Sequence, residues 1–400
     1  MAQTKEDQDC INQFVEYLRI PTVHPNIDYE PAVNALKKLC SKINGIKFST
    51  FSLVPNNPFL LATLPGKYPE KKSLLLLNHM DVVPANKETW TVDPFEGKII
   101  DGEIFGRGAQ DMKCVAIQQI NALKRLIQSG FVPNRTVHMM FTPDEELDRH
   151  GVRLLANSDY FRKLNVGFVM DEGIASPSDE ILLFYGERSC HSVRISCRGN
   201  AGHGSQFIKN AAADKFLRIF SEIQSYRKEQ ERILEENSDL TLGEVNTVNI
   251  NVISGGSQIN VVPSELEMLV DCRLSPFQDI EEFNSLVDSW VTQIGGPGCT
   301  WAKYYDNVPN KPNVSKIEGT WWETLLDCLS QLEIPIKKTI LSAGTDCSYL
   351  RAVGYNCVGF SPLHNTPVLL HDDDERLSIE VFLQGIRVYE KIFENLLSIN

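Results

Sequence analysis

Histidine and carboxylate side chains follow the ends of several apolar runs in the sequence. The run Leu74–Leu77 leads directly into a segment in which His79 and Asp81 lie two residues apart. Residues at this spacing point to the same side of an extended chain, so the imidazole and the carboxylate should converge. A metal-bound histidine needs a partner that fixes its tautomer, which Asp81 could supply. A single histidine at a strand end is more often an ordinary polar residue. Whether His79 binds a metal therefore depends on whether other apolar runs also end in possible ligands.

Two further apolar runs also end in acids. Thr136–Thr142 leads into Glu145 and Glu146, and Val166–Met170 leads into Glu172. Crowded carboxylates are costly unless a cation lies between them. Neighbouring residues of an extended chain point in different directions. We therefore expect one of the two adjacent glutamates to bind metal while the other accepts a proton from water. A solvated acidic loop is the alternative, and it would be favoured if only one run ended in this way.

Two more candidate ligands are Asp111 and His371. Asp111 directly precedes the predicted helix Met112–Ser129, which Gly130 closes, and Asp is a good helix N-cap. The cap and ligand roles are compatible, because such a junction faces the crevice where α/β proteins bind ligands. His371 lies in the acidic segment Leu369–Glu375. Imidazole and carboxylate together suit zinc or manganese, so the sequence predicts a metal site.

Alternating strands and helices must position these residues. Strand-helix-strand repetition predicts an α/β domain with a largely parallel sheet, which binds ligands beyond the carboxyl ends of its strands. The predicted buried strands are Phe59–Leu64, Ser73–Leu77, Thr136–Thr142 and Val166–Met170.

The pattern changes near Arg188, because apolar and polar residues alternate with period two in the predicted strands that follow. Two helices and four such strands predict a small α+β sandwich inserted in the larger domain. The expected segments are His191–Cys197, Asn210–Glu236, Val245–Ile253, Glu265–Arg273, Asp279–Ile294 and Cys299–Tyr304. Asp306–Val314, rich in turn formers, would be the return linker. We expect the catalytic domain at 1–188, the inserted domain at 189–308 and the completing part of the catalytic domain at 309–400.

Composition restricts the partners. The 400 residues carry a formal net charge of -13, which argues against nucleic acids and anionic membranes. The N-terminus has no apolar signal region, and no stretch approaches about 18 apolar residues. The ten cysteines show no regular spacing, which suits reduced thiols. We therefore expect a cytoplasmic protein.

Taken together and in this order, the motifs resemble those of the di-zinc amidohydrolase and peptidase family, which includes glutamate carboxypeptidase and acetylornithine deacetylase. The likeness covers essentially the whole chain, and within the family it is greatest to the aminoacylases. It is carried by Asn78–Pro84, Gly106–Lys113, Pro143–Glu146, Asp171–Ala175, Gly202-His203, Glu187–Ser189 and Thr366–Glu375. One departure is the segment Leu147–Gly151, which is a residue shorter than the family pattern and lacks its glycine pair.

The resemblance implies two Zn²⁺ ions per subunit in a zinc-peptidase-like catalytic domain with flanking helices. His79, Asp111 and Glu172 would hold one ion, and Glu146, Asp111 and His371 the other, with Asp111 bridging. Asp81 would orient His79, and Glu145 would be the general base.

The resemblance also assigns roles to the inserted domain, as a dimerisation and lid domain of a homodimer. His203 would reach the partner's site and stabilise the oxyanion, although alone it is a loop histidine beside glycines. Arg273 would clamp the substrate carboxylate, or else form an ordinary ion pair. Asn260 would be a second substrate contact, and Asp346 would be either a site residue or a helix cap.

The implied activity is hydrolysis of N-acyl-L-amino acids to a carboxylate and a free L-amino acid. A dipeptidase, a carboxypeptidase or an acetylornithine-type deacetylase with the same metal site is the alternative. A metal-bearing binding module without catalysis is the candidate from another class.

Overall fold

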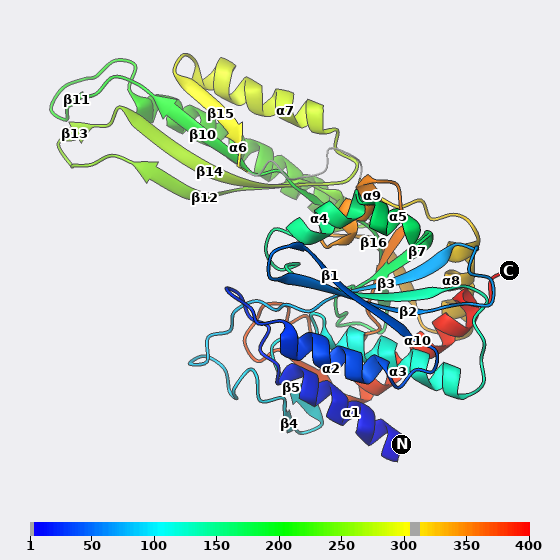
Figure 1. Ribbon diagram of the computed structural model, residues 1–400. Coiled ribbons are helices and arrows are strands. Elements are labelled where there is room, and N and C mark those ends of the chain that lie inside the picture. The colour runs from blue at the N-terminus through cyan, green and yellow to red at the C-terminus, as the bar shows by residue number, and fades with distance from the viewer. Residues whose placement is uncertain (1–3, 305–312) are drawn as a thin grey trace. The chain divides into compact units, whose positions relative to one another are not determined.

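The computed structural model describes residues 4–304 and 313–400. The chain forms two compact units (Figure 1). The first unit comprises Met1–Tyr185, Ser315–Lys338 and Thr345–Asn400, and the second comprises Gly186–Val314 and Thr339–Gly344. Most of the predicted return linker, Asp306–Val314, falls outside the described residues, as does the boundary expected after residue 308.

An eight-stranded mixed sheet runs through the first unit, and the predicted α/β class is confirmed. Its four central strands, β6, β3, β7 and β17, are parallel neighbours, and antiparallel strands flank them. In sheet order the strands are β1 (Lys47–Val54), β2 (Asn57–Leu64), β6 (Val137–Thr142), β3 (Ser73–His79), β7 (Val166–Asp171), β17 (Cys357–Phe360), β8 (Ile181–Glu187) and β16 (Ile336–Leu341).

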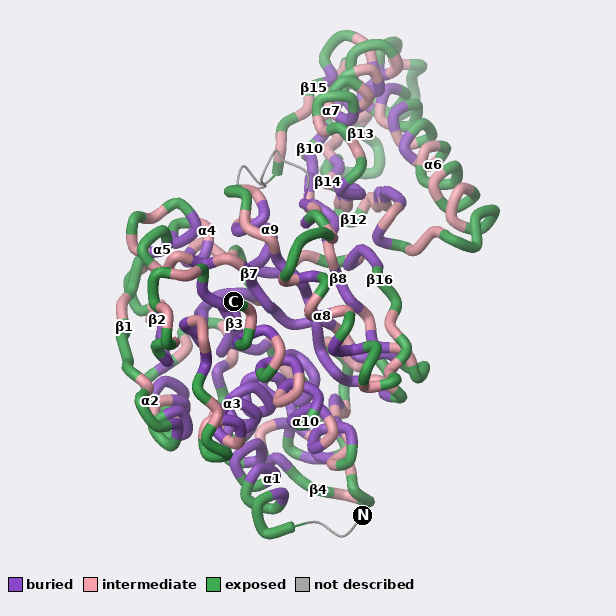
Figure 2. The backbone as a smooth tube through the Cα atoms, turned by 90° about the vertical axis from the view of Figure 1, so that its right-hand side faces the viewer, coloured by how far each residue is buried: buried purple, intermediate pink, exposed green. Residues whose placement is uncertain are grey.

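Helices cover both faces of this sheet, which explains why its central strands are continuous apolar runs. In β3, Leu74 and Leu76 join one hydrophobic cluster, and Leu75 and Leu77 join another on the opposite face. Figure 2 shows β3 and the helices α3 and α10 buried over most of their length. The first cluster includes residues of α1 (Lys5–Leu18), α2 (Glu30–Cys40), α3 (Lys113–Gln128), α8 (Thr320–Gln331) and α10 (Ile379–Leu396), and the second includes residues of α4 (His150–Ala156), α5 (Asp159–Lys163) and α9 (Cys347–Ala352).

The parallel strands end at one edge of the sheet. In the register of β3 with β6, His79 lies opposite Thr142, and β7 ends at Asp171 on the other side of β3. The acids that follow β6 and β7 are therefore delivered to the same edge as His79. A small three-stranded sheet of β4 (Lys98–Ile100), β5 (Glu103–Phe105) and β18 (Arg376–Ser378) lies elsewhere in the unit, and its β5–β18 pairing joins two distant parts of the chain.

The second unit is an antiparallel sheet with helices packed on one face, as predicted. Its helix α6 begins two residues later than expected, and its second helix continues as a π-helix. The sheet order is β12 (Thr247–Gly255), β14 (Glu265–Leu274), β10 (Val193–Arg198) and β15 (Cys299–Lys303), with β9 (Ser189–Cys190) beside β14. The remaining elements are α6 (Ala212–Glu236), the 3-10 turn Leu242–Glu244, α7 (Ile280–Ser289), the π-helix Trp290–Gly295 and the two-stranded ribbon of β11 (Gly202–His203) and β13 (Val261–Val262).

Two general expectations can be compared with the described residues. None of the helices in the described ranges combines the length and the apolar character that a membrane crossing requires. All ten cysteines lie within these ranges as free thiols, and every one except Cys190 is buried.

Gly359 of β17 packs closely against the residue that follows β7 and against β8. A Cβ atom at this position would lie 2.6 Å from the carbonyl oxygen of Glu172 and 3.1 Å from Cβ of Phe184. Because a backbone atom is the obstacle, we expect Gly359→Ala to lower the free energy of unfolding by roughly 2 kcal/mol, within the usual range for overpacking.

Differential scanning calorimetry would measure this loss as a lower Tm. Val353→Ala, at an exposed position shortly before the same strand, is the control and should leave the Tm nearly unchanged. An unchanged Tm for Gly359→Ala would show that the strands separate without cost and that the close packing is unimportant.

Candidate metal centre

His79 lies at the end of β3 and is almost completely buried. Its Nδ1 is 2.9 Å from the main-chain oxygen of Asp81 and donates to it, so Nε2 is the nitrogen that would offer its lone pair to a metal ion. Nε2 lies 2.9 Å from Oδ1 of Asp111 and 3.2 Å from Oε1 of Glu172. The predicted first ligand set therefore converges on one point.

His371 faces the other oxygen of Asp111. Its Nε2 lies 3.3 Å from Oδ2 of Asp111 and 3.2 Å from Oε2 of Glu146. The two carboxylate oxygens of Asp111 thus point to two different histidines, and each histidine has a second carboxylate partner. This is the arrangement that a bridging carboxylate between two cations requires.

The spacing of these donor atoms fits divalent cations. Ligand atoms about 2.0–2.1 Å from a tetrahedral zinc lie roughly 3.3 Å from one another. The four histidine–carboxylate distances fall between 2.9 and 3.3 Å. Imidazole nitrogen and carboxylate oxygen also form the donor mixture that zinc and manganese accept. The residues present therefore fit a pair of such ions.

The electrostatics of the buried groups also favour a cation. Burial, followed by the negative charge of Asp111, holds the pKa of Glu172 well above its usual value. Burial acts to lower the pKa of His79, but the carboxylates of Glu172 and Asp111 outweigh it and raise that pKa well above its usual value. In His371, hydrogen bonds to Asp111 and Glu146 raise the pKa to about 10. These acids hold or attract protons in place of the positive charge that a metal would supply.

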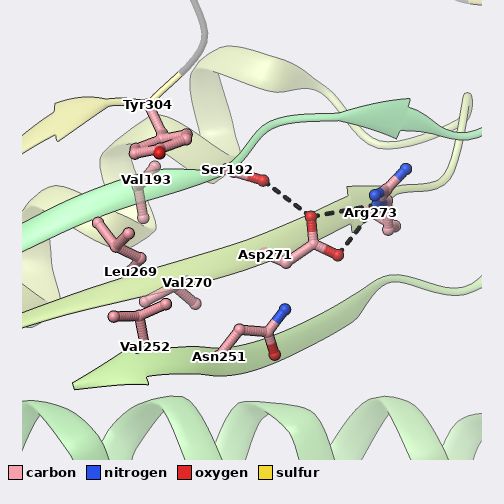
Figure 3. A pocket seen from close by; sticks show the side chains of 9 residues that line it. All are labelled: Ser192, Val193, Asn251, Val252, Leu269, Val270, Asp271, Arg273 and Tyr304. Atoms are coloured by element: carbon pink, nitrogen blue, oxygen red, sulfur yellow. Dashed lines mark hydrogen bonds and ion pairs between the residues drawn. The ribbon is translucent and has the colours of Figure 1, made fainter. Parts of the chain in front are cut away.

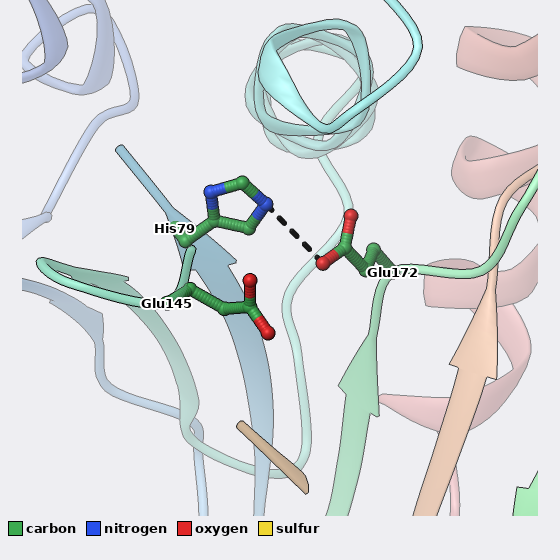
Figure 4. A group of neighbouring side chains, drawn as sticks. All are labelled: His79, Glu145 and Glu172. Atoms are coloured by element: carbon green, nitrogen blue, oxygen red, sulfur yellow. Dashed lines mark ion pairs between the residues drawn. The ribbon is translucent and has the colours of Figure 1, made fainter. Parts of the chain in front are cut away.

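The adjacent glutamates have different close partners. Oε2 of Glu146 lies 3.2 Å from Nε2 of His371, and both Glu145 and Glu146 have a carboxylate oxygen within 4.8 Å of a ring nitrogen of His79. Figure 4 shows the Glu145 carboxylate beside His79 and Glu172, whose side chains point toward one another. Nε of Arg149 lies 3.8 Å from Oε1 of Glu145, and Arg149 belongs to the segment that departs from the family pattern.

Asp81 anchors the turn that carries both glutamates. Its Oδ1 accepts the main-chain N–H of Glu145 at 3.2 Å, and its Oδ2 accepts that of Glu146 at 3.0 Å. Its carboxylate is 3.6 Å from Nδ1 of His79, so the shorter contact to that ring is made by the main-chain oxygen. Burial acts to raise the pKa of Asp81, but hydrogen bonds, first of all from His24, hold that pKa well below its usual range.

His24 is a site residue that the sequence did not indicate. Its Nε2 lies 2.8 Å from Oδ2 of Asp81, although 57 residues separate the two in the chain. It precedes β1 and follows no apolar run that ends in acids, so no local signal distinguished it.

Neither of the two aspartates considered as a helix cap makes a capping hydrogen bond. The N-cap of α3 is Met112 and makes no side-chain hydrogen bond, so Asp111 does not cap that helix. Asp346 occupies the N-cap position of α9 without a capping bond. Instead, its Oδ2 accepts a hydrogen bond from the hydroxyl of Thr142 at 2.7 Å, at the end of β6.

His203, Asn260 and Arg273 all lie in the second unit. His203 and Asn260 are exposed and adjacent, because the N–H of Gly204 donates to the main-chain oxygen of Asn260 at 2.8 Å. Arg273 lines a recess of about 330 Å³ on the sheet (Figure 3). Its Nε donates to Oδ2 of Asp271 at 3.0 Å, which is the ion pair expected as the alternative to substrate binding.

Comparisons with known proteins show the family to which the chain belongs. A model of peptidase family M20/M25/M40 matches residues 75–395. Aminoacylase-1 of Sus scrofa is 39% identical over 98% of this chain and 96% of its own length, and aminoacylase-1 of Homo sapiens is 37% identical over 99% and 97%. Among solved structures, an M20 family metallo-carboxypeptidase from Sulfolobus solfataricus is similar in fold, with a TM-score of 0.76 and 16% identity over 99% of this chain and 100% of that one. The matched residues include every predicted metal ligand.

If the donor set binds cations, metal should stabilise the folded protein. A ligand that binds only the folded state stabilises it by about 4 kcal/mol when its free concentration is about 1,000 times its Kd. We expect Zn²⁺ to raise the Tm of chelator-treated protein in differential scanning calorimetry. Asp111→Asn should lose most of this increase, whereas Asp373→Asn, at an exposed acid two residues after His371, should keep it. Equal increases in both variants would contradict the assignment of Asp111.

His24 should affect metal binding indirectly, through its hydrogen bond to Asp81. In His24→Leu a buried carboxylate oxygen loses a donor, which should loosen the Glu145–Glu146 turn and weaken Zn²⁺ binding about tenfold, as other changes behind metal ligands do. His24→Gln retains an N–H donor and should bind Zn²⁺ more tightly than His24→Leu. Equilibrium dialysis with Zn²⁺ measures both variants, and wild-type affinity in His24→Leu would rule out this role.

Proposed function

The chain belongs to peptidase family M20/M25/M40, and from that premise we propose that it hydrolyses N-acyl-L-amino acids to a carboxylate and a free L-amino acid. The observation that carries the proposal is the similarity to aminoacylase-1 over nearly the whole length of both chains. The donor set at the sheet edge supports it, because a metal-dependent amidohydrolase needs such a set.

The contacts support the metal assignment. His79, Asp111 and Glu172 would hold one cation, and Asp111, Glu146 and His371 the other. Zinc is the proposed metal, with two ions per subunit, because nitrogen and oxygen donors at these spacings suit it. Such ions, when bound, activate a water molecule and polarise the scissile carbonyl.

Glu145 is the proposed general base. Its carboxylate lies at the centre without a histidine ion pair of the kind that engages Glu172 and Glu146, and Asp81 fixes its main chain. It would accept a proton from the attacking water and deliver that proton to the nitrogen of the leaving amino acid. Asp81 acts on the reaction indirectly, by holding both this turn and the tautomer of His79.

The second unit would supply substrate recognition. Arg273 would bind the substrate carboxylate, Asn260 would make a second contact, and His203 would stabilise the oxyanion in the site of a partner subunit. This assignment requires a homodimer that forms through the second unit. The exposed position of His203 and Asn260 on adjoining segments supports it. A cytoplasmic location would suit the free thiols.

Glu145→Gln separates hydrolysis from simple binding. The substitution keeps the size of the side chain and removes its ability to accept the proton. We expect kcat for N-acetyl-L-methionine to fall by a factor of roughly 10²–10⁴, the usual contribution of general acid–base catalysis. Release of free methionine measures the reaction.

Asp148→Asn is the matched control, because Asp148 is an exposed acid in the same loop, and its kcat should be unchanged. A Glu145→Gln variant as active as the wild type would remove Glu145 from the chemistry. Retention of tight substrate binding with no turnover in the wild type would instead favour the binding module.

A substrate panel separates the alternatives. We expect zinc-loaded protein to prefer N-acyl-L-amino acids to dipeptides and to N-acetylornithine, with kcat/KM as the measure. A preference for dipeptides would establish the peptidase alternative, and no release of amino acid from any amide would overturn the hydrolase proposal.

A further inference from the structure

His371 is supplied by a segment without regular secondary structure. The histidine has a φ of 62°, in the left-handed region, and its side chain is 53% exposed. A non-glycine residue holds such a conformation only when its surroundings impose it. The other proposed histidine ligand, by contrast, ends a buried strand.

Gln110 holds this segment on both sides of His371. Its Nε2 donates to the main-chain oxygen of Pro367 at 3.0 Å and to that of Arg376 at 2.9 Å, and its Oε1 accepts the N–H of Leu369 at 3.0 Å. Gln110 is almost completely buried and immediately precedes Asp111. Both N–H groups and the oxygen of this amide are thus directed at one segment.

Arg107 and Glu375 form a second connection between the same two segments. Nη1 of Arg107 donates to the Glu375 carboxylate at 2.9 Å and to the main-chain oxygen of Asp372 at 3.1 Å, and Nη2 donates to that of His371 at 3.3 Å. The Glu375 carboxylate in turn accepts the N–H groups of Gly108 at 2.8 Å, Gln110 at 2.6 Å and Asp111 at 3.2 Å.

The contacts of Gln110 and Arg107 with the His371 segment serve one half of the centre directly. His371 belongs to the second proposed ligand set alone, whereas Asp111 belongs to both sets. His79 is the last residue of β3 and Glu172 follows β7, and the ring of His79 is fixed by the main chain of Asp81. Loosening the His371 segment should therefore disturb the second set more than the first.

We propose that Gln110 and Arg107 are positioning residues that hold His371 against Asp111 and so set the affinity of the second cation, with little effect on the first. The inference rests on the proposed two-cation centre. Glu375 stands apart, because it holds the main chain of Asp111, which would serve both cations.

Gln110→Met is the most informative variant. It preserves the size of the side chain and leaves no charge buried without a partner. Substitution of Arg107 would instead leave the buried carboxylate of Glu375 without its ion pair. Pro367, Leu369 and Arg376 are exposed or half-buried, so their released main-chain groups can reach water and the chain should fold.

The experiment is a calorimetric titration of chelator-treated full-length protein with Zn²⁺, with a competing chelator to resolve tight binding. The wild type should bind two ions. In Gln110→Met the affinity for the second ion should fall about 10- to 100-fold, the usual effect of removing a group behind a metal ligand, while the first changes less than about threefold.

Gln118→Met is the matched control. Gln118 is a fully buried glutamine of α3 whose Nε2 donates to the main-chain oxygen of Phe382 at 3.1 Å, a contact outside the segment that carries His371. Its loss removes one buried side-chain hydrogen bond where Gln110→Met removes three, and it should leave both Zn²⁺ affinities unchanged. Gln110→Asn, which keeps the amide but shortens its reach, gives the same test if Gln110→Met does not fold.

The outcomes separate this inference from the proposed function. Binding of fewer than two ions by the wild type would overturn the two-cation centre itself. Two ions bound by the wild type and unchanged affinities in Gln110→Met would overturn only the positioning role. An equal loss of both affinities would also overturn it, because the effect would then be general.

Discussion

The central physical constraint in this protein is the crowding of carboxylates and two histidines at one edge of a buried sheet. Burial alone disfavours the charged form of each acid, and neighbouring negative charges add to the cost. The pKa values of Glu172 and His79 are both raised, because burial and neighbouring negative charges favour the protonated form of Glu172 and the nearby carboxylates favour that of His79. A pair of divalent cations would remove it, and the proposed hydrolysis of an amide needs the same ions.

The fold delivers these groups by simple means. Parallel strands end together, so β3, β6 and β7 place His79, the two adjacent glutamates and Glu172 around one point. Asp111 and His371 lie in segments outside the helices and strands. The β5–β18 pairing and the hydrogen bonds of Gln110 bring these segments together. Regular structure thus positions one half of the centre, and buried side-chain hydrogen bonds position the other.

Much of this arrangement could be predicted from the sequence, because strand ends and apolar runs are local signals. The α/β class and the inserted sheet with its helices were predicted in this way and are confirmed. The family was predicted from the resemblance of the motifs, and it is confirmed as well. His24 and Gln110 were not found, since their partners lie 57 and about 260 residues away in the chain and no periodicity links them. The cap expected at Asp111 was wrong, because Met112 holds that position and Asp111 faces the histidines instead. An ion pair of Arg273 was expected as the alternative to substrate binding, but its partner was not named. The partner is Asp271, two residues earlier on the same strand and therefore on the same side of it.

The most direct test of the account is anomalous X-ray scattering at the zinc edge from crystals of the zinc-loaded protein. The proposed two-cation centre should give two peaks, one among His79, Asp111 and Glu172 and the other among Asp111, Glu146 and His371. A single peak, or a peak with Glu145 as a ligand, would contradict the division of roles between the adjacent glutamates. No peak at this edge of the sheet would contradict the metal centre as a whole.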